Sequence, residues 1–198
     1  MPDNPTLGVE REKVKTAGYP TWSEVQIARF EERYPVGTKE RLAFGLLLYT
    51  GQRRGDVIRT GPLHIHKGIL TIDQGKMEGN ETAHLEIPVH PKLQAIIDAT
   101  PTVGLKTFLV TAFGRPFTPN GFGKWFRTQC DQAGCAGVSA HGLRKACARR
   151  LAEIGCTAHE IASITGHASL AEVERYTRAA DRKRLAGSAM RKLVQGEP

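Results

Sequence analysis

The chain has 198 residues, enough for one domain of ordinary size with a hydrophobic core. Its 28 Lys and Arg residues outnumber its 20 Asp and Glu residues, and the net charge of +8 favours a polyanionic partner, nucleic acid before an anionic membrane. Because no apolar run reaches the roughly 18 residues of a spanning helix and the polar start lacks a signal-peptide region, the sequence argues against a membrane protein and predicts a cytoplasmic one.

The first elements lie between residues 1 and 50. Residues 1–20 are rich in Pro, Gly and charge without an apolar period, which predicts a linker or arm. Thr21 followed by Glu24 predicts a capping box, and the helix that it opens should end before Pro35. The sequence therefore predicts that the body of the domain begins with a helix.

The next segments predict a buried helix and a hairpin. Thr38 and Gly51 are suited to begin and end a helix that carries apolar residues on one stripe. Residues 68–73 and 84–89 both alternate apolar and polar side chains, and a polar, Gly-containing segment separates them. These two segments predict antiparallel strands joined by a long exposed loop.

The middle of the chain predicts shorter elements. A helix should begin at Pro91, and residues 107–111 read as a short strand. Thr118 is the expected N-cap of a further helix, with Pro119 at its first position.

The last third predicts only helices. One begins near His141 and closes on Gly155. Two capping boxes follow, Thr157 with Glu160 and Ser169 with Glu172. A separate amphipathic helix is expected over residues 181–194, weakened by Gly187. Together the elements predict a mostly helical α+β domain with a small antiparallel β-sheet.

The four cysteines form no paired pattern. Cys130, Cys135, Cys147 and Cys156 contain no C-x-x-C pair, so reduced and partly buried thiols are expected. Cys156 and His159 would need two more ligands to hold zinc, and no second pair has suitable spacing. We therefore predict neither a metal nor a cofactor.

Basic side chains cluster at the expected helix ends. Arg53 follows the glycine that ends a buried helix, which would hold it in a fixed turn. His141 and Arg144 are three residues apart at a helix start and so face the same side. Guanidinium groups match two phosphate oxygens at once and stay charged, so these residues predict a phosphate site.

A tyrosine and a second histidine extend this site. His167 stands just before the expected N-cap Ser169, and Tyr176 lies in the second turn of the helix that follows. Both can point into one pocket if that helix packs beside His141 and Arg144. A phenol is a poor nucleophile until cations and a proton acceptor activate it, and this cluster contains both.

The motifs "TGQRRGD", "HGLR" and "TGH", with "YT" nine residues after the last, resemble those of the tyrosine recombinase (phage integrase) family. Lys76 in "QGKMEG" matches the lysine that the family carries between two strands. The resemblance runs from about Thr21 to about Leu193. A single motif would be weak, whereas five in the same order and spacing are specific.

The resemblance implies the catalytic-domain fold of that family and a metal-free phosphoryl transfer to DNA. Arg53 and Arg144 would hold the scissile phosphate, and His141 and His167 would hydrogen-bond it. His141 would accept the proton of Tyr176, the nucleophile that forms a 3′-phosphotyrosine bond. Two further residues are assigned, Lys76 as the acid for the departing 5′ oxygen and Asp56 as an orienting residue behind the first arginine.

The resemblance also implies how the protein meets DNA. The partner would be double-stranded DNA, bound by a homotetramer in a bacterial or phage-encoded, nucleoid-associated protein. Candidate contacts to the DNA backbone are Arg54, Lys145, Arg175 and Arg178. Residues 21–181 would be the catalytic domain, and residues 182–198 a C-terminal segment that packs on a neighbouring protomer. The helical core-binding domain that usually precedes this domain is expected to be absent.

Two positions depart from the family pattern, and other functions stay open. Thr165 replaces a leucine common before the Gly-His pair, and Lys145 stands where many relatives have histidine. A site-specific recombinase for integration or excision of a mobile element is the leading hypothesis. The alternatives are a topoisomerase of the IB type and a DNA-binding module without activity, although binding alone would not require Tyr176. A metal-dependent nuclease fits worst, because no acidic residues cluster at ligand spacing.

Overall fold

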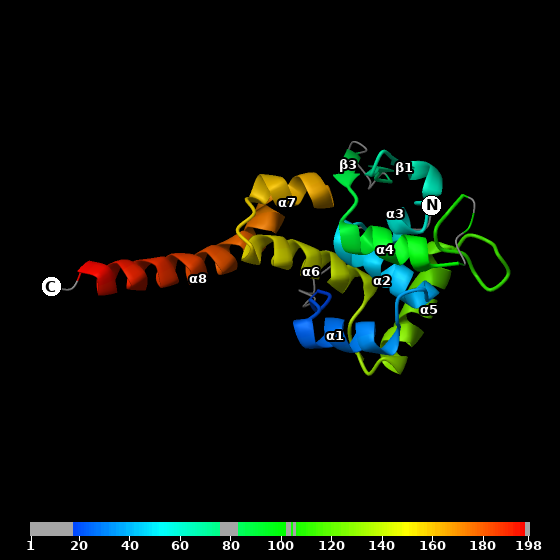
Figure 1. Ribbon diagram of the computed structural model, residues 1–198, viewed down its shortest axis with the longest axis horizontal. Coiled ribbons are helices and arrows are strands. Elements are labelled where there is room, and N and C mark those ends of the chain that lie inside the picture. Colours follow the sequence, from blue (N-terminus) through cyan, green and yellow to red (C-terminus); the bar gives the residue numbers. More distant parts are fainter. Residues whose placement is uncertain (1–17, 76–82, 102–103, 105, 197–198) are drawn as a thin grey trace, which may run out of the picture.

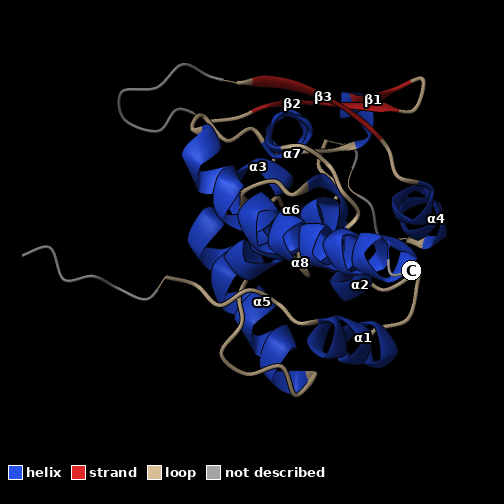
Figure 2. Cartoon of the chain, turned by 90° about the vertical axis from the view of Figure 1, so that its left-hand side faces the viewer, coloured by secondary structure: helices blue, strands red, loops and turns tan. Residues whose placement is uncertain are grey.

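The structure is a computed structural model that describes residues 18–75, 83–101, 104 and 106–196. Helices surround a central helix, and a small sheet covers one side (Figures 1 and 2). The helices are α1 (Glu24–Arg33), α2 (Lys39–Thr50), α3 (Arg54–Val57), α4 (Pro91–Ala99), α5 (Pro119–Gln132), α6 (Ala140–Glu153), α7 (Ala158–Thr165) and α8 (Leu170–Gly196), with a short 3-10 helix at Pro62–His64. The predicted fold class, mostly helical α+β, is confirmed.

Helix α2 forms the centre of the core together with α6. Thr38 caps α2 by accepting a hydrogen bond from the amide of Arg41, and Gly51 ends it in the left-handed conformation, both as predicted. Every residue from Leu42 to Leu48 is buried, so α2 is covered on all sides rather than along one stripe. Arg53 lies only three residues after the end of α2, so its backbone is anchored to the buried core.

Helix α1 begins two residues later than predicted. Ser23 is the N-cap, and its capping-box partner is Gln26, so the box assigned to Thr21 and Glu24 is wrong. The reason lies in Trp22, which is fully buried and donates a hydrogen bond from Nε1 to the carbonyl of Ser139 at 2.9 Å. This contact holds the chain extended up to Trp22. The helix ends before Pro35, as predicted.

The sheet contains the predicted hairpin. Strands β2 (Ile69–Asp73) and β3 (His84–Pro88) pair antiparallel, with Leu70 opposite Ile87. A short strand β1 (Ile65–His66), which the sequence analysis missed, pairs with the other edge of β2. The buried face of the hairpin packs against Ile164 of α7. The end of β2 is thereby placed beside the turn that follows α7.

The strand predicted over residues 107–111 is wrong. Val110 makes only an isolated bridge to Pro116, and the amide of Phe108 donates to the carbonyl of Thr60. Phe108 and Leu109 are apolar because they fill the helical core. Buried side chains in a short run of this kind do not require a partner strand.

The remaining helix boundaries follow the predicted signals except at the end of the chain. Thr118 caps α5 with Pro119 at its first position, and Thr157 with Glu160 forms the predicted capping box of α7. The separate last helix is wrong, because α8 is continuous and extends away from the rest of the fold (Figure 1). Gly187 costs only about 1 kcal/mol in a helix, too little to end one without a proline or a cap.

Within the described ranges, none of the helices combines the length and the apolar character needed to cross a membrane.

Candidate active site

Five of the six predicted catalytic residues line one cavity of about 530 Å³. It lies between the start of α3, the start of α6, the turn after α7 and the first turns of α8. The five are Arg53, His141, Arg144, His167 and Tyr176. Residues up to 123 positions apart in the sequence thus share one site. Lys76, the sixth predicted catalytic residue, lies outside the described residues.

Arg144 is the most deeply buried cation of the site. Its side chain is 2% exposed, and Nη1 donates hydrogen bonds to the carbonyl oxygens of Gly51, at 2.9 Å, and Thr165. The guanidinium therefore ties the end of α2 to the end of α7. Burial and the nearby Arg53 lower the pKa of Arg144 to about 10, so it remains charged at neutral pH.

Arg53 is fixed at the N-terminus of α3, where it is the N-cap residue. Its Nη1 donates to Oε1 of Gln74 at 3.3 Å. The side chain is partly exposed and lines the cavity opposite Arg144. Two guanidinium groups thus face the same space, an arrangement suited to a phosphate.

The two histidines are held as neutral rings. Burial lowers the pKa of His167 to about 4, and Arg144, Arg53 and His141 add to the effect. Loss of water on the cavity side, together with Lys145, Arg144 and Arg53, also lowers the pKa of His141. A neutral ring can accept a proton at physiological pH, which an imidazolium cannot.

Tyr176 is half-buried on α8 and packs against the small apolar cluster formed by α6, α7 and α8. Burial and the charge of Glu172 raise the pKa of its phenol, whereas Arg144 and Arg175 act in the opposite direction. Before substrate binds, the residue is therefore a protonated phenol and needs an acceptor for its proton.

Glu172 is a cavity residue that sequence reasoning missed. The motif had assigned it to a capping box with Ser169, but its carboxylate lines the cavity, with Oε2 4.0 Å from Nε2 of His167. The spacing could have predicted this position, because Glu172 stands one helical turn before Tyr176 and therefore lies on the same face of the helix.

A pair of buried glutamines supports the site from behind. Nε2 of Gln74 donates to Oε1 of Gln52 at 2.6 Å and to the carbonyl of Thr165 at 2.8 Å, while its Oε1 accepts from Arg53. Gln52 donates in turn to the carbonyl of Ile164 at 2.7 Å. One network thus joins the ends of α2, β2 and α7. Gln74 was not predicted, because nothing local in the sequence marks a buried amide.

Asp56 has partners other than the one expected. Its Oδ1 accepts from Arg59 at 2.5 Å and from the amide of Gly75 at 3.0 Å. Among the described contacts of Arg53, the orienting partner is Gln74 and not Asp56. Asp56 therefore fastens the end of β2, next to the position of Lys76 in the sequence, to α3.

Two of the four candidate DNA contacts belong to the cavity, and the other two lie outside its lining. Lys145 and Arg175 line the cavity, and Nζ of Lys145 donates to the carbonyl of Tyr19 at 2.7 Å. Arg54 is exposed beside Arg53, and Arg178 is exposed on α8, 3.6 Å from Glu174. Lys145 and Arg175 thus add two positive charges to a cavity that already contains Arg53 and Arg144.

Residues 23–183 match the phage integrase family. The chain belongs to the phage integrase family. A comparison with curated proteins finds no match to the sequence.

Solved structures of recombinases share the phage integrase fold of this chain. XerA recombinase is 20% identical with a TM-score of 0.69, over 90% of this chain and 67% of its own. A lambda integrase tetramer bound to a Holliday junction gives 20% identity and a TM-score of 0.69, over 89% and 52%. The Tn1549 transposon integrase, in complex with transposon right end DNA, gives 16% and 0.68, over 88% and 68%. This chain thus spans about half the length of the lambda integrase chain.

Proposed function

We propose that this protein is a site-specific DNA recombinase that cleaves and rejoins strands through a 3′-phosphotyrosine intermediate, for integration or excision of a mobile element. The observation that carries the proposal is the meeting of Arg53, Arg144, two neutral histidines and Tyr176 in one cavity, in a chain of the phage integrase family. Binding alone would not require a tyrosine at the wall of a phosphate site.

The chemistry is an in-line displacement at phosphorus. Oη of Tyr176 forms a bond to the scissile phosphorus as the bond from phosphorus to the 5′ oxygen breaks. His141 accepts the phenol proton, and its lowered pKa keeps the ring neutral beforehand. The departing 5′ oxygen takes a proton from Lys76. Attack by a 5′ hydroxyl of a second duplex reverses the step, so strands are exchanged without ATP.

The arginines stabilise the charge that builds on the phosphate. Arg144 has one nitrogen bonded to two carbonyls, which holds the guanidinium in place and leaves its other N–H groups for the phosphate. Arg53, steadied by Gln74, would hold another non-bridging oxygen. Donors fixed before the reaction need no reorganisation during it, and removing one such donor typically costs about 10² to 10³ in rate. His167 would complete the contacts to the phosphate.

The DNA partner and the assembly are carried over from structural relatives. The lambda integrase is bound as a tetramer to a Holliday junction, and the Tn1549 integrase is bound to transposon DNA. By the same logic this protein would act as a homotetramer on double-stranded DNA, in association with the nucleoid. Arg54, Lys145, Arg175 and Arg178 would contact the backbone.

The distal part of α8 would supply the contact between protomers. It carries exposed apolar side chains on an otherwise basic helix, Leu185, Met190, Leu193 and Val194. With residues 21–181 as the catalytic domain, deletion of residues 182–198 should weaken association on DNA and leave the catalytic cavity in place. Unchanged assembly would contradict this assignment.

The proposal is tested by trapping the covalent intermediate. Nicked duplexes with a randomised core are incubated with the protein in EDTA at low salt, denatured, and examined for protein linked to DNA. We expect an adduct with the wild type and none with Tyr176→Phe. An adduct that persists in Tyr176→Phe would overturn the assignment of the nucleophile, and DNA binding without any adduct would favour a binding module. Relaxation of supercoiled plasmid without strand exchange would instead indicate a topoisomerase.

A further inference from the structure

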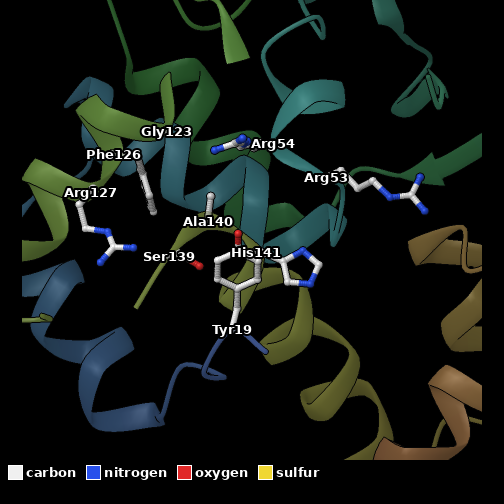
Figure 3. A pocket seen from close by; sticks show the side chains of 9 residues that line it. All are labelled: Tyr19, Arg53, Arg54, Gly123, Phe126, Arg127, Ser139, Ala140 and His141. Atoms are coloured by element: carbon white, nitrogen blue, oxygen red, sulfur yellow. The ribbon is translucent and has the colours of Figure 1, made fainter. Parts of the chain in front are cut away.

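A second hollow of about 320 Å³ lies beside the catalytic cavity and shares Arg53 and His141 with it (Figure 3). Besides residues at the start of α6, its lining includes Arg54 at the start of α3, Arg127 on α5, and Tyr19 in the segment before α1. Below, we call it the arginine pocket. Figure 3 shows the Arg53 side chain directed away from Arg127, so this arginine stands between the two spaces.

Two cations face the arginine pocket without a protein anion to balance them. Arg54 and Arg127 are both exposed, and in the described part of the chain neither guanidinium has an acceptor within hydrogen-bond or ion-pair distance. Some exposed arginines elsewhere on the fold do have a carboxylate partner, such as Arg59 with Asp56 and Arg184 with Asp181. Paired cations without an anion are the expected lining of a phosphate site.

Gly123 keeps Arg54 in the pocket. A Cβ atom at this position would lie 2.5 Å from Nη1 of Arg54, so any other residue on this face of α5 would push the guanidinium away. Arg127 stands one helical turn further along α5 and therefore on the same face. The packing of α3 against α5 thus brings the two guanidinium groups to one side of the hollow.

Tyr19 is fastened to the opposite side. Nζ of Lys145 donates to its carbonyl at 2.7 Å, and Gly142 makes room for Pro20, whose oxygen would lie 2.4 Å from a Cβ there. The Tyr19 ring rests beside the ring of His141, with centroids 5.1 Å apart, yet is 57% exposed. An aromatic face is therefore held open toward the same space as the two arginines.

We propose that the arginine pocket binds the nucleotide next to the scissile phosphate, with its phosphate on Arg54 and Arg127 and its sugar against Tyr19. The inference rests on the proposed function, because the shared residues Arg53 and His141 would touch the scissile phosphate itself. A strand that lies across the catalytic cavity would then continue directly into the pocket. The pocket would hold the strand on one side of the cleavage point, and Arg54 and Arg127 would bind the DNA directly.

The first arm of the test needs no cleavage. Binding of a short DNA duplex is measured against salt concentration for the wild type, Arg54→Ala, Arg127→Ala and, as a control at an exposed arginine that does not line the pocket, Arg33→Ala. Each pocket variant should lower the slope of log affinity against log salt by about one, and the control should leave it unchanged. Unchanged slopes in both pocket variants would overturn the proposal. This arm reads the pocket even if no covalent adduct ever forms.

The second arm locates the contact. Substrates selected in the trapping assay are made with a neutral methylphosphonate in place of either phosphate that neighbours the cleavage point. On one side, the neutral linkage should reduce adduct formation by the wild type about tenfold, and Arg127→Ala should lose a similar factor on normal DNA. When Arg127→Ala is tested on DNA with that neutral linkage, adduct formation should be no lower than with either change alone. If Arg127→Ala reduced adduct formation further with the neutral linkage at either of the two positions, Arg127 would contact neither phosphate, and the assignment would be overturned.

Tyr19 is tested with a conservative pair. Tyr19→Phe keeps the ring and should retain adduct formation, whereas Tyr19→Ala should reduce it by about tenfold, because the sugar loses the apolar surface on which it rests. Both variants keep the backbone bond to Lys145. Equal activity of the two variants would show that the ring does not touch the substrate and would remove Tyr19 from the pocket's role.

Discussion

The hydroxyl oxygen of Thr165 lies 2.6 Å from Nδ1 of His167 and 2.7 Å from the carbonyl oxygen of Ile161. A hydroxyl has one proton, and a carbonyl can only accept, so the Thr165 proton goes to Ile161. Nδ1 of His167 must then carry a proton and donate it to Thr165. In the neutral ring this leaves Nε2, the nitrogen near Glu172, unprotonated.

This relationship makes a prediction about tautomers. In Thr165→Val, which keeps the shape and removes the hydroxyl, His167 should lose its preference for the proton on Nδ1, whereas Thr165→Ser should keep it. Nitrogen-15 NMR of the histidine rings distinguishes the two tautomers without DNA or turnover. A spectrum of the wild type with the proton on Nε2 would contradict the assignment.

A consequence concerns phosphate binding. Phosphate oxygens only accept, so Nε2 can hydrogen-bond them only after His167 has gained a second proton. Thr165 is compatible with that imidazolium as well, because it accepts from Nδ1 in both states. A leucine, which the family resemblance leads one to expect at this position, has no side-chain acceptor to offer to Nδ1.

Stability should depend on pH through His167. Its pKa is about 4 in the folded protein against 6.5 ordinarily, so the unfolded chain binds more protons between these values. Folding stability should therefore rise with pH from about 4 to about 6.5 and lose this dependence above it. The contribution at the acid end is roughly 3 kcal/mol. Urea unfolding of the wild type and His167→Gln at several pH values should show a shallower rise in the variant, and parallel curves would refute this origin.

Glu172 should restrain the tyrosine. Its negative charge raises the pKa of both Tyr176 and His141, so Glu172→Gln should lower both. The phenol titration is followed by ultraviolet difference spectra, with Tyr176→Phe subtracted to remove the other tyrosines. DNA affinity should increase severalfold, because a carboxylate beside the phosphate is lost. Superimposable titration curves for wild type and variant would show that Glu172 does not act on the phenol.

The glutamine network should matter for both stability and activity. Gln74→Leu keeps the side-chain volume but removes the donor to Oε1 of Gln52 and the acceptor of Arg53, while the Thr165 carbonyl keeps its bond from Arg144. Leaving buried polar groups unpaired should cost about 1–3 kcal/mol in unfolding free energy. Covalent adduct formation should also decrease.

Gln94 provides the matched control for this change. Within the described residues its amide bonds only to Asp98, one turn further along α4, and the contact is exposed, so Gln94→Leu should change stability by less than about 0.5 kcal/mol. Equal effects of the two substitutions would mean that the buried network has no special role. Denaturant unfolding and the trapping assay together provide both readings.

Local signals predicted most of the fold. The N-caps Thr38, Thr118 and Thr157 and the left-handed Gly51 act within one helical turn, which is why they are legible in a sequence. The failures depended on contacts with distant residues. Burial of Trp22 moved the start of α1 to Ser23, and an apolar run at Phe108 proved to be core filling rather than a strand.

The candidate site shows the same division. The motifs predicted the side chains that line the cavity. They did not predict the groups that fix the orientation and protonation of those side chains. Thr165 stood out only as a departure from the family pattern, and its contact to His167 depends on the tight turn after α7. Gln74 and Tyr19 come from segments remote in sequence, so their approach to Arg53 and His141 is set by packing that no motif encodes.

Tyr176 and Leu193 belong to one uninterrupted helix, with the phenol packed into the domain and the leucine about 25 Å further out at the rise of an α-helix. An unbroken helix transmits a displacement along its length instead of absorbing it at a joint. A protein contact at the distal end of α8 can therefore displace Tyr176 within the cavity. Two glycines inserted near Gly187 would make α8 flexible between its distal end and Tyr176. Contacts at the distal end would then no longer move the nucleophile, although every side chain of the cavity would be unchanged.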